Sequence, residues 1–387
     1  MASLRIIFIA NTYPSRQQPN TGTFIEQIVN AMARQDACLT VLAPQILAPG
    51  RVSWSKKISQ TSNTLPVTVF RPLTLSFSNF SIPFIGSTYC WSVWSFLRTV
   101  QSLRRCVDPT SNCCYGHFLY PAGLAALNLA RFLNVPAIVA LGESSLANYE
   151  RYFSIAKIRD DLSGFAGILT VSEKNKNYCV EHYGIPPKKI VVLPNAVDIS
   201  LFYPRERSAM RSKLGLPQDL PIVAFVGHFI ERKGPLRVME ALKAIPDVKA
   251  VFLGAGPQKP MGTQVLFAGP VPQEEIPEWL SAADLFILPT LAEGSCNAIL
   301  EAMACALPVI SSDLSFNHEI LDSSSALLVD PCDTISLTHA IFNIISSKQL
   351  RENMGTSALD RVRLFTLEDR AKRILAWLET INIIEIN

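Results

Sequence analysis

Short apolar runs, each followed by turn residues and a longer helical pattern, repeat along most of this chain. Such runs are typical of strands that are buried on both faces of a parallel sheet and joined by helices. In the first half they occupy residues 6–10, 39–43, 68–71, 137–140 and 167–171. We therefore predict an α/β fold with doubly wound parallel sheets.

The length of the chain predicts two domains. Its 387 residues exceed what one hydrophobic core usually supports. Residues 191–204 mark a boundary, because a strand there gives way to turn residues. We predict an N-terminal lobe over residues 1–200, a C-terminal lobe over residues 201–365 and a terminal segment over residues 366–387. An amphipathic helix with Ile374, Leu375 and Leu378 on one side covers much of this last segment.

The composition argues against one class of partner. The 35 basic residues nearly balance the 32 acidic ones, so the net charge is only +3, and we expect no nucleic acid to bind. Nine cysteines without metal-like spacing favour a reducing, cytoplasmic location. The N-terminus reads as a strand and a turn rather than as a signal peptide, so we expect no cleavage.

The longest membrane candidate, residues 82–97, contains Gly86, Ser87 and Thr88 and falls short of the ~20 residues that span a bilayer. Its aromatic residues and the arginines after it have two readings, either peripheral contact with a membrane interface or a core-facing helix of the first lobe. The residues are Phe84, Tyr89, Trp91, Trp94, Phe96, Arg98, Arg104 and Arg105.

Residues 288–311 contain two glutamates where an apolar strand, a small-residue loop and a helix meet. The free backbone N–H groups and the helix dipole at residues 295–298 favour an anionic phosphate. Glu301 lies one turn into the helix, where its carboxylate can accept hydrogen bonds from a ribose diol. Glu293 stays in the loop, within reach of sugar hydroxyls. The spacing alone also fits two ordinary exposed carboxylates, so the flanking sequence has to decide.

A second anion-binding pattern follows the strand at residues 222–226. Gly227 allows close approach of a ligand to the backbone, and the basic loop Arg232-Lys233-Gly234 enters a helix. A solvated cationic face is the alternative reading for the two basic residues. His228, directly after Gly227, is a weaker partner for phosphate than an arginine.

Glu293-Gly294, with Leu-Glu-Ala-Met-Ala and Leu-Pro-Val-Ile-Ser behind it, resembles the retaining glycosyltransferases of the GT-B fold, family 4. The resemblance covers nearly the whole chain. It implies two Rossmann-like lobes whose parallel sheets face each other across a cleft, and a terminal helix that crosses back to the first lobe. It also implies a UDP- or GDP-sugar as donor, no cofactor and no required metal.

The resemblance assigns roles to individual residues. Glu293 and Lys233 are implied to act in catalysis, together with His117, which orients the sugar or its acceptor. Glu301 is implied to bind ribose, and Val271 to meet the nucleobase with its backbone. The remaining donor-binding candidates are Gly22, Thr23, Phe24, Gly227, His228, Arg232, Gly294, Ser295, Cys296 and Asn297.

Two polar residues of the first lobe keep alternative readings. A lone histidine beside a buried strand, such as His117, is as often a structural residue as a functional one. Glu143 follows the strand at residues 137–141 and can contact acceptor hydroxyls or act as a base. The other reading of Glu143 is a helix-capping or solvent-facing carboxylate.

Three departures from the family pattern bear on activity. Ala196 stands where the family has glycine, His228 where it has arginine, and Ser295-Cys296 where it has an aromatic residue and glycine. We predict a retaining hexosyltransferase that acts on a glycan or lipid-linked acceptor in polysaccharide or surface-glycan biosynthesis. Its expected location is the cytoplasm, including the inner face of the membrane. The alternatives are a sugar-nucleotide-binding protein with impaired catalysis and a nucleotide-sugar epimerase of the same fold.

Overall fold

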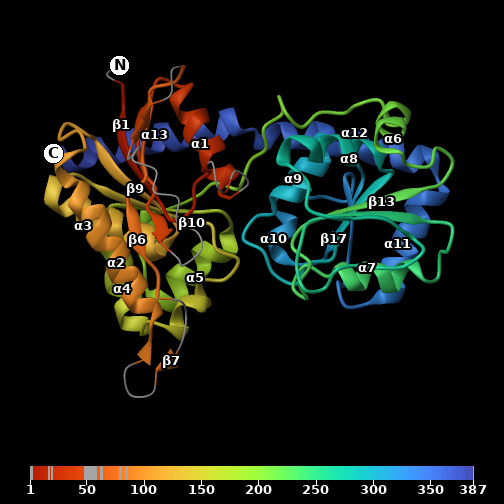
Figure 1. Cartoon of the computed structure of the whole chain (residues 1–387), viewed down its shortest axis with the longest axis horizontal. Helices are drawn as coiled ribbons and strands as arrows, with labels where there is room; N and C mark the ends of the chain where they lie inside the picture. Colours follow the sequence, from red (N-terminus) through yellow and green to blue (C-terminus); the bar gives the residue numbers. More distant parts are fainter. Residues whose placement is uncertain are drawn as a thin grey trace. The chain divides into compact units, whose positions relative to one another are not determined.

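The computed structural model describes residues 3–15, 18, 21–47, 59–61, 64–77, 81–82 and 86–386. The chain forms two compact units (Figure 1). Unit 1 contains residues 1–193 and 368–387, and unit 2 contains residues 194–367.

The main sheet of unit 1 has eight strands in the order β12-β11-β10-β9-β1-β2-β5-β4. Neighbouring strands are parallel except for β4, which pairs antiparallel with β5 at one edge. The bounds are β1 Arg5–Ala10, β2 Cys38–Leu42, β4 Ser59–Thr61, β5 Val67–Phe70, β9 Cys113–His117, β10 Ala137–Leu141, β11 Gly167–Thr170 and β12 Ile190–Val192. The five strands predicted for the first half are confirmed to within one residue.

Two small sheets accompany this main sheet. They pair β3 (Gln45–Leu47) with β6 (Leu73–Leu75), and β7 (Ser81–Ile82) with β8 (Gly86–Ser87). The helices of unit 1 are α1 Thr23–Ala33, α2 Tyr89–Ser102, α3 Leu124–Leu133, α4 Ile155–Ser163, α5 Glu173–Tyr183 and α13 Leu367–Ile386.

The alternation of side chains in β1 explains how these helices cover the sheet. Ile7 and Ile9 face the core formed with α2 and α3, which pack against each other (Figure 1). Ser172 caps α5 by accepting a hydrogen bond from the backbone N–H of Asn175. On α13, the predicted apolar face is confirmed, because Ile374, Leu375 and Leu378 are all buried.

Unit 2 has a six-stranded, fully parallel sheet in the order β15-β14-β13-β16-β17-β18. Figure 1 shows α7 and α11 on one side of this sheet and α8, α9 and α12 on the other. The strands are β13 Ile222–Val226, β14 Lys249–Leu253, β15 Val265–Gly269, β16 Leu285–Leu288, β17 Val309–Ser312 and β18 Ala326–Val329. The helices are α6 Arg207–Leu214, α7 Pro235–Leu242, α8 Ile276–Ala282, α9 Asn297–Ala304, α10 Ser315–His318, α11 Thr334–Ser346 and α12 Lys348–Val362.

Each sheet contains one point at which the strand order reverses. In unit 1 the chain winds outward from β1 through β2 on one side and through β9 on the other. In unit 2 it winds outward from β13 through β14 on one side and through β16 on the other. Ligands of open α/β sheets bind beyond the carboxyl ends of the strands at such a point. The loops after β1, β9, β13 and β16 are therefore where a site is expected.

No helix among the described residues is both long enough and apolar enough to cross a bilayer.

Candidate functional site

The loops after β13 and β14 approach each other at two glycines. Gly254 follows β14, and a Cβ placed on it would lie 2.0 Å from the backbone oxygen of Gly227. Gly227 donates its N–H to Leu253 O at 2.9 Å. Because Gly254 has no side chain, the loop after β14 packs directly against the backbone of the loop after β13.

Glu293 lies at the centre of an ion-pair cluster at the reversal point of unit 2. Its Oε1 atom pairs with Lys233 Nζ and lies 2.8 Å from Arg232 Nη1. Thr290 Oγ1 donates to the same oxygen at 3.1 Å. Glu293 is buried, and the side chains of Lys233 and Arg232 are 12% and 35% exposed. The cluster joins the loop after β13 to the loop after β16.

Backbone contacts hold these two loops together as well. Arg232 Nη1 donates to Ala292 O at 2.5 Å, and Leu291 N donates to Arg232 O at 2.8 Å. Arg232 O lies 3.2 Å from Thr290 Oγ1 and is an alternative acceptor for its single proton. Sequence reasoning brought Glu293, Arg232 and Lys233 to one site but missed Thr290, which has no distinguishing signal in the sequence.

Asn195 is a second residue that sequence reasoning missed. Its N–H donates to Ser295 Oγ at 3.1 Å and its Nδ2 donates to Ser295 O at 2.9 Å. The signal for it is the segment Pro-Asn-Ala-Val-Asp, which lies within residues 191–204 and predicts only a domain boundary. Ala196 is not among the described non-glycine residues with positive φ, so alanine fits this turn without strain.

Helix α9 points its N-terminus at the same loop. Cys296 occupies the N-cap position without a side-chain cap hydrogen bond, and Asn297 begins the helix. The Oδ1 atom of Asn297 is buried and has no hydrogen-bond partner among the described residues. Gly294 and Ser295, which precede the N-cap residue in the loop, are buried. Burial raises the pKa of the Cys296 thiol to about 11, so it stays protonated. An anion at this position would meet free N–H groups and the positive helix end.

Glu301 lies one turn into α9, in the position predicted for a ribose ligand. Burial raises its pKa from 4.5 to about 7, against the opposing effect of Lys233. A carboxyl group with this pKa is only partly ionised at neutral pH, yet it accepts two hydroxyl hydrogen bonds best as an anion.

The raised pKa of Glu301 gives a pH-dependent stability. The folded chain keeps the proton to higher pH than the unfolded chain, so Glu301 lowers the free energy of unfolding as pH rises from 4.5 to about 7. Glu301→Gln is therefore expected to raise the free energy of unfolding at pH 8 by about 1 kcal/mol, a value kept small because the side chain is only partly buried, and to raise the melting temperature with it. Both should change little at pH 4.5.

Thermal melts of wild type and Glu301→Gln at both pH values check this expectation. Glu240→Gln, at an exposed position on α7, serves as the matched control. An equal shift at the two pH values would mean that the ionisation of Glu301 does not cause it.

The two remaining donor-side candidates differ in exposure. His228 is exposed directly after Gly227, and its ring is not fixed by packing. Val271 is half-buried and packs against the core of unit 2, in the segment between β15 and α8.

In unit 1 the structure brings Phe24 close to His117. Gly22 is the N-cap of α1 with φ of 75°, and a Cβ there would lie 2.8 Å from the backbone of Thr12. Thr23 begins the helix, and the ring of Phe24 lies 5.6 Å from that of His117. These loops follow β1 and β9, the two strands at the reversal point of this sheet.

His117 ends β9 and is buried among aromatic rings. Burial and the neighbouring Arg370 lower its pKa to about 3, so the ring is neutral at physiological pH. Its Nδ1 has no hydrogen-bond partner among the described residues. A neutral ring can orient a hydroxyl group, but it carries no charge.

Glu143 is held by hydrogen bonds within unit 1, one of them from the backbone N–H that begins the short helical segment Leu119–Gly123, so the capping interpretation is borne out in part. Its Oε1 accepts hydrogen bonds from Leu119 N at 3.0 Å and from Tyr149 Oη at 2.6 Å. Burial raises its pKa. The Oε2 atom is buried without a partner within the described part of the chain, so it keeps capacity to accept a hydrogen bond.

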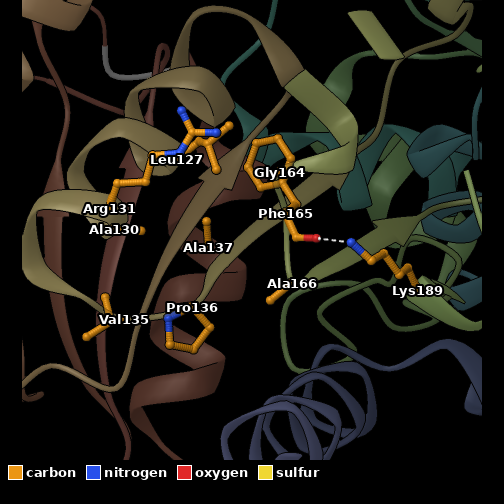
Figure 2. A pocket seen from close by; sticks show the side chains of 10 residues that line it. All are labelled: Leu127, Ala130, Arg131, Val135, Pro136, Ala137, Gly164, Phe165, Ala166 and Lys189. Atoms are coloured by element: carbon orange, nitrogen blue, oxygen red, sulfur yellow. Dashed lines mark hydrogen bonds between the residues drawn. The ribbon is translucent and has the colours of Figure 1, made fainter. Parts of the chain in front are cut away.

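A separate hollow of about 200 Å³ lies in unit 1 at the start of β10 and β11 (Figure 2). Two basic side chains, Arg131 and Lys189, line it, and Lys189 donates to the backbone oxygens of Ser163 and Phe165 at 3.0 and 3.1 Å. The hollow lies at the amino ends of the strands, whereas His117 and Gly22 follow the carboxyl ends. It is therefore separate from the candidate site.

Comparison with known families identifies the class of protein to which these two units and their candidate site belong. The profile of the glycosyl transferases group 1 matches residues 206–361, and that of Glycosyltransferase Family 4 matches residues 21–201. The chain belongs to the GT-B glycosyltransferases of group 1. The family resemblance and the α/β fold with two Rossmann-like lobes, both inferred from the sequence, are confirmed.

Individual relatives agree with this family assignment. This chain is 28% identical over 358 residues to TuaC of Bacillus subtilis (strain 168), which is named for teichuronic acid biosynthesis. The match covers 87% of this chain and 88% of TuaC. It is 28% identical over 253 residues to UDP-Gal:alpha-D-GlcNAc-diphosphoundecaprenol alpha-1,3-galactosyltransferase of Escherichia coli, covering 59% of this chain and 65% of that protein. Among solved structures, it resembles Anabaena Alr3699/HepE in complex with UDP-glucose, with a TM-score of 0.71, 18% identity and 97% and 100% coverage. At that identity the likeness shows the fold alone.

Proposed function

We propose that this glycosyltransferase moves a hexose from a nucleotide-diphosphate donor to a glycan or lipid-linked acceptor, with retention at the anomeric carbon. The observation that supports the proposal most directly is the cluster of Glu293, Lys233 and Arg232 at the reversal point of unit 2, beside the N-terminus of α9. It combines two cations, free N–H groups and a sugar-binding carboxylate at the edge where α/β sheets bind ligands.

The donor end of the proposal rests on charge. A diphosphate would bring negative charge to Lys233, Arg232 and the positive end of α9. Glu301 would accept the ribose hydroxyls, and the backbone near Val271 would meet the base. We favour a UDP-sugar over a GDP-sugar, because the Escherichia coli relative is named for UDP-Gal and the Anabaena structure contains UDP-glucose.

In the proposed mechanism, catalysis depends mainly on stabilising the departing diphosphate. The bond between the sugar C1 and the phosphate oxygen breaks, an acceptor hydroxyl oxygen bonds to C1, and the hydroxyl proton passes to the departing phosphate. The charge that develops on the phosphate is held by Lys233, Arg232, His228 and the N–H groups at Asn297. These residues supply the positive charge, so the proposal invokes no metal and no cofactor. Glu293 orients the two basic side chains and stabilises positive charge on the sugar.

The acceptor end of the proposal uses unit 1. The Nδ1 atom of neutral His117 and the Oε2 atom of Glu143, which lack partners among the residues that the structure describes, are both capable of hydrogen bonds to hydroxyl groups. Gly22, Thr23 and Phe24 line the neighbouring loop. A glycan or polyprenyl-diphosphate sugar fits this chemistry, and the names of the Bacillus and Escherichia relatives support that class of acceptor.

A donor panel tests the proposed function. Among UDP, GDP and their sugars, UDP and one UDP-hexose are expected to raise the melting temperature, because they bind the folded state. The same UDP-hexose should release UDP slowly to water without acceptor, and faster with an acceptor glycan.

The panel also separates the alternatives. Binding without any release of UDP would support the impaired sugar-nucleotide-binding protein. Conversion of the free nucleotide sugar to its epimer would support the epimerase. If no nucleotide stabilises the chain, the proposed site is wrong.

A further inference from the structure

The acidic residues are unevenly distributed along the chain. Residues 37–142 contain eight lysines and arginines but a single acidic residue, Asp108, so their formal charge is 8 − 1 = +7. Because the whole chain carries +3, the remaining residues carry 3 − 7 = −4. Asp108 is itself paired with Arg5 at 2.9 Å. The positive charge of this segment is therefore hardly compensated by its own residues.

Helix α2, in the middle of this segment, has two different faces. Val93, Phe96 and Val100 are buried against α3 and the sheet. On the opposite face Trp91 is 42% exposed and Trp94 is 58% exposed. The predicted aromatic set therefore divides between the two readings, with Phe96 in the core and both tryptophans at the surface. Phe84 lies outside the described residues.

Arginines and further aromatic rings extend this surface. Arg98 lies over the ring of Trp94, with 5.4 Å from its guanidinium carbon to the ring centroid. Arg104 lies over Phe132 of α3 at 4.8 Å, and Phe132 is 54% exposed. We call Trp91, Trp94, Arg98, Arg104, Arg105 and Phe132 the aromatic–arginine face.

The positive charge of the arginines on this face is not neutralised by any carboxylate of the described residues. None of Arg98, Arg104 and Arg105 pairs with a carboxylate in the described part of the chain, and α2 and α3 carry no acidic residue. A shallow hollow of about 490 Å³ opens between Arg98, Arg104 and Arg105. Exposed tryptophans beside unpaired arginines match the polar–apolar boundary of a bilayer, where indole rings and cations are both favoured.

We propose that the aromatic–arginine face docks on the surface of a bilayer rich in anionic phospholipid, with Trp91 and Trp94 in the head-group region and the arginines on lipid phosphates. A two-fold contact with a second copy is disfavoured, because it would bring one set of unpaired arginines against another. The inference does not depend on the identity of the donor or acceptor.

Vesicle sedimentation with the full chain tests this docking. Wild type is expected to bind vesicles of phosphatidylglycerol and phosphatidylcholine, to bind pure phosphatidylcholine far more weakly, and to dissociate at high salt. The double variant Arg98→Gln/Arg105→Gln should bind anionic vesicles about twenty-fold more weakly. Trp91→Ser/Trp94→Ser should weaken binding about ten-fold and abolish a vesicle-induced blue shift of the tryptophan emission.

Matched substitutions on other surfaces are the controls. Lys372→Gln/Arg373→Gln removes two exposed charges from α13, and Phe342→Ser removes an exposed ring from α11; both should bind anionic vesicles within two-fold of wild type. Circular dichroism and melting curves establish that each variant is folded. The proposal would be overturned if the wild type did not bind anionic vesicles, or if the variants of the aromatic–arginine face bound them as well as the controls do. So would concentration-dependent self-association in ultracentrifugation that the tryptophan variant abolishes.

Discussion

Replacement of Glu293 by alanine is expected to lower kcat by about 100-fold or more, while the affinity for free UDP stays the same or rises. The carboxylate is assigned to the sugar, which free UDP lacks. Its removal also frees Lys233 and Arg232 from their shared partner, so two cations are left to attract a diphosphate. A fall in turnover without a fall in UDP affinity is therefore the signature of this residue.

Steady-state kinetics with the UDP-hexose and calorimetry with UDP measure the two effects. Glu293→Gln keeps the shape and removes the charge, so it should share the loss of turnover. Glu240→Ala, on the exposed side of α7, should behave as wild type. Unchanged turnover in Glu293→Ala would refute the assignment of this carboxylate to catalysis.

Replacement of Lys233 by alanine is expected to weaken UDP binding by about 30-fold, or ~2 kcal/mol, the range for a charge-assisted hydrogen bond at a buried position. The loss should be confined to ligands with a diphosphate, because the lysine is assigned to phosphate and not to the nucleoside. Calorimetry with UDP and with uridine therefore separates the two assignments. Uridine binding should change less than two-fold.

The lysine variant needs its own control, because the change also leaves Glu293 with fewer cations. Lys243→Ala removes a lysine at the surface end of α7, where its side chain is 70% exposed, and should leave UDP affinity unchanged. Lys233→Arg restores the charge and should recover part of the affinity. Equal losses for UDP and uridine would mean that Lys233 supports the fold of the loop rather than the diphosphate.

The sheets and the donor loops were predictable from sequence because their signals are local. Buried parallel strands read as apolar runs, and a glycine or basic residue after such a run marks a loop at the carboxyl edge. The runs at residues 6–10 and 137–140 correspond to β1 and β10. The antiparallel edge strand β4 was not predicted, because its three residues, Ser59–Thr61, carry no apolar pattern.

The pairings inside the site were not predictable, because they depend on which residues the fold brings together. Sequence reasoning gave Glu293 to the sugar and Lys233 to the phosphate, but not the ion pair between them. It left Glu143 as a base or a cap, whereas its Oε1 joins Leu119 N to Tyr149. It also could not divide the aromatic residues of α2 between core and surface, since only packing against α3 decides which side is covered.

The close approach of Gly227 to Gly254 bears on the one residue that most distinguishes this chain from its family pattern. Packing dictates the glycine at position 254, because any side chain there would collide with the backbone of Gly227, whereas a Cβ on Gly227 itself would meet its nearest neighbours at 3.7 Å. His228 comes immediately afterwards and is exposed, so the fold tolerates many residues there. The histidine in place of arginine is thus not a requirement of architecture. We therefore expect the residue at position 228 to affect donor binding and the rate of diphosphate release, and to be replaceable without loss of the fold.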